Sequence, residues 1–306
     1  MSTRKDDRPL FPAREWPTWA LMLACQGAWL AVVLGHGALG PAWAFAAVPL
    51  AVLHASLQHE ALHGHPTASR RLNELLVFPA LGLFVPYRRF RDLHVRHHVD
   101  ERLTDPHDDP ESWYVDAGDW SRTGPVTRAL LRANATLLGR ISIGPALAVA
   151  GFWRSEWRAA RRGVPDVRRA WLVHAAALVP VLLALGAAGL PVLLYAAAVA
   201  YPAMSVLMVR TFVEHRAAGR VGERTAVVEA GPLMSLLFLN NNLHAVHHRA
   251  PSLPWYALPA RWREEREATL LANGGYHYPG GYRSVAARWL VRVREPVVHP
   301  GRRETV

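Results

Sequence analysis

The chain has 306 residues, of which 51% are hydrophobic, and its formal net charge is +11. Its single cysteine, Cys25, excludes an intramolecular disulfide and a thiolate-rich metal site. The sequence has no Asp, Glu, Lys or Arg between Trp16 and His59 or between Ala170 and Val209. Uncharged blocks of this length predict an integral membrane protein. Anionic lipid headgroups are sufficient partners for the basic residues, so we expect no nucleic-acid partner.

Each uncharged block is long enough for two membrane-spanning helices, because one span needs about 20 apolar residues. Glycine and proline interrupt the first block at residues 35–41 and the second at residues 185–191, which predicts a tight turn in each. The sequence therefore predicts an all-α integral membrane fold with two helical hairpins, residues 17–59 and 170–209. Their four spans are Pro17–Leu34, Ala42–His59, Ala170–Ala184 and Val192–Val209.

The remaining segments carry the basic residues, and both turn loops are uncharged. Because positively charged loops stay on the cytoplasmic side, we expect both termini and the middle segment in the cytoplasm, as for a bacterial-type inner membrane protein. The prediction is one domain over residues 1–306. It comprises a polar tail (1–15), the first hairpin, a cytoplasmic segment (60–169), the second hairpin, and a second cytoplasmic segment (210–306) that completes a helical cap.

Histidines form three clusters, which we call the first box (His59–His63, HEALH), the second box (His94–His98, HVRHH) and the third box (His244–His248, HAVHH). On a helix, residues i, i+3 and i+4 lie on one patch, so the histidines of each box can converge. Imidazole suits Fe, Zn, Cu and Ni. The first box also spells H-E-x-x-H, the zinc-protease signature, with Glu60 as the base. That alternative needs a further ligand, and the second hairpin has no carboxylate.

The predicted topology brings these clusters together. His59 ends the first uncharged block, and His215 follows the second, so both hairpins return a histidine to the cytoplasmic side. A metal transporter or sensor would place its ligands deep within the spans instead. Nine histidines on one side can hold two metal ions: His59, His63, His94, His97, His98, His215, His244, His247 and His248.

The chain resembles the integral-membrane fatty acid desaturase superfamily, on the strength of "HEALH", "HVRHH", "HAVHH" and the further histidine in "FVEHR". The resemblance implies that these nine histidines bind two irons and that O₂ is the co-substrate, with no catalytic residue separate from the ligands. Five neighbours are candidates to orient the imidazoles: Glu60, His65, Asp100, Glu214 and Asn242. Acyl-CoA desaturases have an asparagine where this chain has Thr211.

The resemblance implies an O₂-dependent desaturase that introduces a double bond into the acyl chain of a membrane lipid. A di-iron hydroxylase or ketolase acting on a lipid, a carotenoid or an alkane is the alternative, because both reactions begin with the same hydrogen abstraction. The length of the chain favours desaturation, since carotenoid ketolases and hydroxylases are more compact. We expect the electrons to come from a separate ferredoxin-like or cytochrome b5-like protein, because the nearest haem-like string, HYPGG at residues 277–281, is interrupted.

Overall fold

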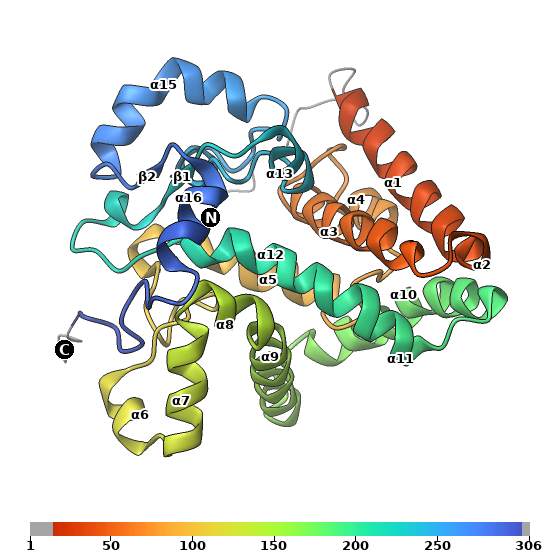
Figure 1. Cartoon of the computed structure of the whole chain (residues 1–306), viewed down its shortest axis with the longest axis horizontal. Helices are drawn as coiled ribbons and strands as arrows, with labels where there is room; N and C mark the ends of the chain where they lie inside the picture. The colour runs from red at the N-terminus through yellow and green to blue at the C-terminus, as the bar shows by residue number, and fades with distance from the viewer. Residues whose placement is uncertain (1–14, 302–306) are drawn as a thin grey trace.

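The computed structural model describes residues 15–301, so the predicted polar tail lies outside the described residues except for Glu15. The fold is mostly helical, as the sequence predicted (Figure 1). Two short parallel strands, β1 (Val227–Val228) and β2 (His277–Tyr278), accompany the helices.

Within residues 15–301, three helices are sufficiently long and apolar to cross a membrane: Trp16–Leu34, Val167–Ala188 and Val192–Glu214. The first is α1, and the second is α10. The third joins α11 (Val192–Tyr195), a π turn (Ala196–Ala200) and α12 (Tyr201–Glu214). Gly189 adopts a left-handed conformation, with φ at 70°, and ends α10 at the predicted turn. Both helices of this hairpin extend past their predicted bounds into charged residues.

The second predicted span corresponds to α3 (Ala42–Leu62), which follows the short α2 (His36–Leu39) and packs against α1. This helix is not among the three apolar candidates. Its C-terminal half carries His54, Gln58, His59 and Glu60, which lower its hydropathy. A fourth span therefore stays a prediction, and the polar end of α3 carries the first box.

The apolar segment at residues 77–86 is too short to span a membrane. It follows α4 (Arg70–Leu76) as irregular backbone and packs against α10 and α11. Ala80 N donates to Ala177 O at 3.0 Å, and Leu83 O accepts from His174 Nε2 at 2.8 Å. Leu81 O accepts from Tyr195 Oη at 3.1 Å. Such bonds satisfy irregular backbone among spanning helices. The second box follows, in α5 (Tyr87–His97).

The middle segment folds into a 3₁₀ turn (Asp100–Arg102) and four helices: α6 (Ala117–Arg122), α7 (Pro125–Asn134), α8 (Leu137–Ser142) and α9 (Gly144–Arg161). Thr136 caps α8 by accepting from Gly139 N. A buried ion pair of Arg89 with Glu156 joins α5 to α9. In Figure 1, α12 runs across the middle of the molecule, and it packs against α3, α8 and α9.

The C-terminal part contains a 3₁₀ turn (Val221–Arg224), α13 (Pro232–Leu237), α14 (His244–Arg249), α15 (Leu258–Ala272) and α16 (Gly281–Trp289). The third box lies in α14. Residues 290–301 then return to the middle segment, where Arg294 N donates to Ala135 O and Val115 pairs with Val298. This last segment covers the region between α12 and the loop before α6.

Candidate metal centre

The first and second boxes lie at the C-terminal ends of α3 and α5, and His215 lies at the C-terminal end of α12, whereas the third box makes up most of the short α14. His63 caps α3, His98 caps α5, and His215 caps α12. A helix C-terminus carries partial negative charge, so three such ends favour a cation between them. The structure brings together all nine histidines that the sequence predicted as metal ligands.

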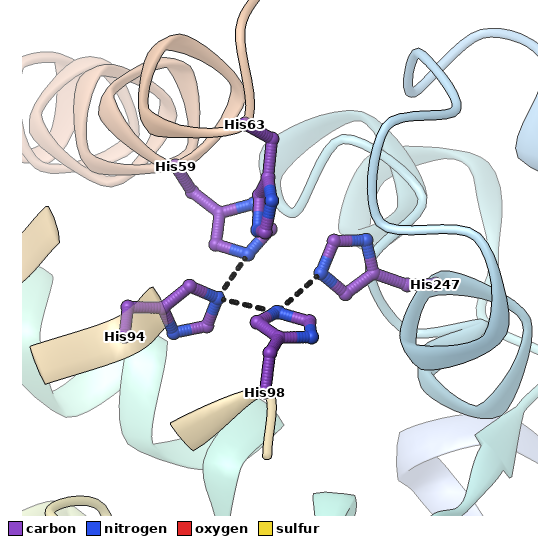
Figure 2. Close-up of side chains that lie close together, drawn as sticks. All are labelled: His59, His63, His94, His98 and His247. Carbon is purple, nitrogen blue, oxygen red and sulfur yellow. Dashed lines mark hydrogen bonds between the residues drawn. The ribbon is translucent and has the colours of Figure 1, made fainter. Parts of the chain in front are cut away.

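These side chains form two groups, in each of which the candidate ligand atoms all lie within 4.8 Å of one another. The first group consists of His59, His63, His94, His98 and His247. Figure 2 shows this group, to which α3, α5 and α14 contribute. The second group consists of His97, His215, His244 and His248. The groups adjoin, since the rings of His98 and His248 stack with centroids 4.3 Å apart.

Spacing within each group fits metal binding. His94 Nε2 lies 3.0 Å from the Nε2 atoms of both His59 and His98. In the second group, His215 Nε2 lies 3.0 Å from the Nε2 atoms of both His97 and His244. Imidazole nitrogens bind a divalent metal such as zinc at about 2.1 Å, so adjacent ligands of one ion lie about 3 Å apart. A single Nε2 lone pair cannot hydrogen-bond two such neighbours, whereas one cation can bind all three.

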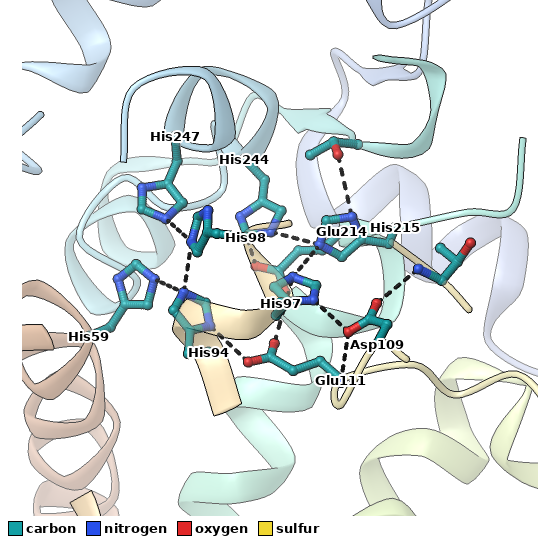
Figure 3. A network of polar contacts seen from close by, with 12 residues as sticks. His59, His94, His97, His98, Asp109, Glu111, Glu214, His215, His244 and His247 are labelled. Carbon is teal, nitrogen blue, oxygen red and sulfur yellow. Dashed lines mark hydrogen bonds and ion pairs between the residues drawn. The ribbon is translucent and has the colours of Figure 1, made fainter. Parts of the chain in front are cut away.

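Two carboxylates that the sequence analysis did not select orient the second box (Figure 3). His94 Nδ1 donates to Glu111 Oε1 at 2.7 Å, and His97 Nδ1 donates to Asp109 Oδ1 at 2.8 Å. Glu111 Oε2 also lies 3.9 Å from His97 Nε2, so this carboxylate reaches both groups. A proton held at Nδ1 directs the Nε2 lone pair toward the metal position. The sequence has an acidic stretch at residues 100–111, directly after the second box, and this stretch could have identified both carboxylates as partners of the histidines.

Charge around the centre suits a cation. Burial lowers the pKa of His215, His244 and His247, and neighbouring histidines lower it further, so these imidazoles are neutral at pH 7 and could bind a metal. Burial also lowers the pKa of His97, but Glu111 and Asp109 outweigh it and raise that pKa to about 9. A negative potential that stabilises a proton on His97 would equally stabilise a metal ion.

Further contacts orient the second group. His244 Nδ1 lies 2.9 Å from Asn241 Oδ1 and 3.4 Å from Glu214 Oε1. Asn241 Nδ2 also lies 3.4 Å from His59 Nε2, so this amide touches a histidine of each group. His215 Nδ1 lies 3.4 Å from Thr225 Oγ1. Polar partners therefore hold imidazoles on both sides of the centre.

Of the five predicted neighbours, Glu214 contacts a histidine of the centre, as just described. Asn242 instead donates to Val228 O at 2.7 Å, and its neighbour Asn241 takes the expected position. His65 joins a different network, with Glu15 and the carbonyl of Ser252. The side chain of Asp100 lies outside the described residues.

Glu60 was considered both as a neighbour of the ligands and as the base of a zinc protease. Its Oε2 atom accepts from Trp255 N at 3.1 Å, so the carboxylate faces the loop that follows the third box. His59 and His63 share their group with three more histidines. A catalytic zinc typically has three protein ligands and an open position. The geometry therefore argues against the protease alternative.

The donor set fits two ions that prefer imidazole, since nine histidine nitrogens and no cysteine line the centre. The buried Nε2 of His63 has no hydrogen-bond partner, as expected of a nitrogen that binds a metal. A family model described as fatty acid desaturase matches residues 28–280, a range that contains all nine histidines. No curated protein matches the chain. The resemblance is thereby confirmed, and the chain belongs to the fatty acid desaturase family.

Proposed function

We propose that this protein is an O₂-dependent di-iron desaturase that introduces a double bond into the acyl chain of a membrane lipid. The family match and the two histidine groups support an oxidoreductase with a metal centre. Two irons held by the nine histidines would supply the oxidising power that removes hydrogen from an unactivated CH₂ group. The protein's own contribution is to hold the acyl chain beside the centre and to keep water away.

A cavity of about 730 Å³ beside the centre carries this proposal. It reaches Glu111, Glu214 and His215, and it continues between α9 and α12 along apolar side chains. This apolar part is lined by Leu147, Phe152, Met204, Leu207 and Met208. Ligand cavities of 300–1,000 Å³ with mostly apolar walls suit small apolar molecules. An extended hydrocarbon chain in this cavity would pass beside the metal positions.

Desaturation and hydroxylation share their first hydrogen abstraction, so the product must be identified chemically. The test is expression in a host with defined lipids, followed by mass spectrometry of the extracted lipids. We expect an acyl product lighter by two hydrogens, and a His97→Ala variant should not form it. A product heavier by one oxygen would instead assign a hydroxylase. An unchanged product from the His97→Ala variant would contradict the metal-centre assignment.

We also propose that both termini and the centre face the cytoplasm of a bacterial-type inner membrane, where the electron donor is found. Arg96 on α5 and Arg249 on α14 are exposed on the helices that carry the second and third boxes. A basic surface there would steer an acidic ferredoxin-like or cytochrome b5-like donor. The rate of reduction should fall as ionic strength rises, and a rate independent of salt would contradict this partner class.

A further inference from the structure

The cavity beside the centre also has a polar part that the metal centre does not use. Arg140 of α8 lines it, and the residue is only 6% exposed. Its guanidinium lies over the ring of Trp113, 3.9 Å from the centroid, and its Nε donates to Asn134 O at 3.1 Å. The Trp113 ring and the backbone at the C-terminal end of α7 thus hold this cation in the cavity wall.

Among the residues that the structure describes, Arg140 forms no ion pair with a carboxylate. The four carboxylates that line the cavity have other partners. Asp109 and Glu111 accept from histidines, and Glu214 lies 2.8 Å from Arg210. Glu295 accepts from Tyr114 Oη at 3.0 Å. Buried charges in proteins are normally paired, so a buried guanidinium without a carboxylate indicates a missing anion.

A second arginine lies in this wall. Arg294 also lines the cavity, and its Nη1 and Nη2 donate to Tyr276 Oη at 2.6 Å and to His215 O at 2.8 Å. Arg140 and Arg294 both lie near the ring of Phe212, at 5.8 and 5.4 Å from its centroid. Glu295 Oε1 lies 3.7 Å from Arg294 Nη1 and offsets the charge of that arginine, whereas Arg140 has no such carboxylate among the described residues.

Asn134 provides an independent observation in the same wall. Its Oδ1 atom is buried and has no hydrogen-bond partner among residues 15–301, and the residue is 3% exposed. A Cβ at Gly144 would lie 3.0 Å from this oxygen, so glycine at that position leaves it room. Native interiors rarely leave such polar atoms unsatisfied, so this wall lacks a polar ligand. An amide oxygen accepts hydrogen bonds and does not bind an oxyanion, so an anion here would be held by Arg140.

We infer that this polar part binds the oxyanionic head group of the acyl substrate through an ion pair with Arg140. The inference rests on the proposed function, and it narrows the substrate to acyl lipids with a carboxylate or a phosphate. The head group would lie against α8, and the hydrocarbon would pass the metal positions toward α9. An alkane or an oxygen-free carotenoid would leave Arg140 unpaired.

Binding of matched probes tests this, without O₂ and therefore without turnover. The metal-loaded full chain in detergent is titrated with palmitate and with methyl palmitate, which has the same chain but no charge. Phosphatidic acid and diacylglycerol form a second pair that distinguishes a phosphate from a carboxylate. We expect the charged member of at least one pair to bind about 10- to 100-fold more tightly, as for a hydrogen bond to a charged group.

Arg140→Gln should remove that preference and leave the affinity for the neutral probe unchanged, while Arg140→Lys should retain part of it. The matched control is Arg132→Gln, which changes an exposed arginine on α7. Equal affinities for both members of both pairs in the unmodified protein would overturn the inference, and this comparison needs no variant to fold. If the Arg140→Gln variant lost equal affinity for the charged and the neutral probes, that result would also overturn the inference. Absence of any oxidised lipid in the expression test refutes the proposed function instead.

Discussion

Replacing Asp109 with asparagine should weaken one metal position more than the other. Asp109 is buried and accepts from three donors: Thr104 N at 2.8 Å, Glu111 N at 2.9 Å and His97 Nδ1 at 2.8 Å. An asparagine has a single oxygen, so its NH₂ group faces at least one of these donors, and the negative charge beside His97 is lost. Removing such a partner of a metal-binding histidine typically lowers metal affinity 10- to 100-fold, or about 1.4 to 2.7 kcal/mol.

The assay is iron content per chain after dialysis against increasing chelator. His97 belongs to the second group, so the variant should lose one iron at lower chelator while the first group retains its iron. Asp108→Asn is the matched control, because the neighbouring side chain is exposed and should change nothing. If the variant lost both irons in parallel, or retained as much iron as the unmodified protein, Asp109 would not support metal binding through His97.

Three further substitutions test the centre and its support. His63→Ala removes one of the five first-group histidines, so iron content should fall toward one per chain and lipid oxidation should stop, as metal analysis and lipid mass spectrometry would show. Glu156→Gln breaks a bidentate pair between the buried Glu156 and the partly buried Arg89, which should reduce stability by about 1–3 kcal/mol and lower the thermal midpoint. Gly144→Ala places a Cβ 2.7 Å from Met208 Sδ, and this overpacking should cost about 1–3 kcal/mol in the same melting assay.

The sequence predicted the convergence of the nine histidines because the evidence for it is local. Histidine spacing within a helix determines which side chains share a patch, and the uncharged blocks indicate where the helices leave the membrane. His215 lies in none of the three boxes and was included because it follows an uncharged block and matches the further histidine of the resemblance, and the structure places it in the second group. The helical hairpin with its turn at Gly189 was predicted from composition in the same way.

The supporting residues were harder to predict because adjacency in sequence is not adjacency in space. Glu60 follows His59 directly, but successive helical residues point about 100° apart, so Glu60 faces Trp255. Asn241 and Asn242 are adjacent in irregular backbone. Such backbone has no regular repeat from which the direction of a side chain could be predicted. Glu111 lies 17 residues from His94, in a loop whose path depends on tertiary packing. The directions of these side chains depend on tertiary packing, so the sequence alone did not predict them.

Helix geometry also explains how each H-x-x-H-H box serves two metal positions. At 100° per residue, positions i and i+4 lie about 40° apart, whereas i+3 lies about 100° from i+4. In α5, the i and i+4 histidines join the first group and the i+3 histidine joins the second. In α14 the assignment is reversed, with His247 alone in the first group. Each of these helices therefore supplies histidines to both groups, so displacing either helix would disturb both groups together.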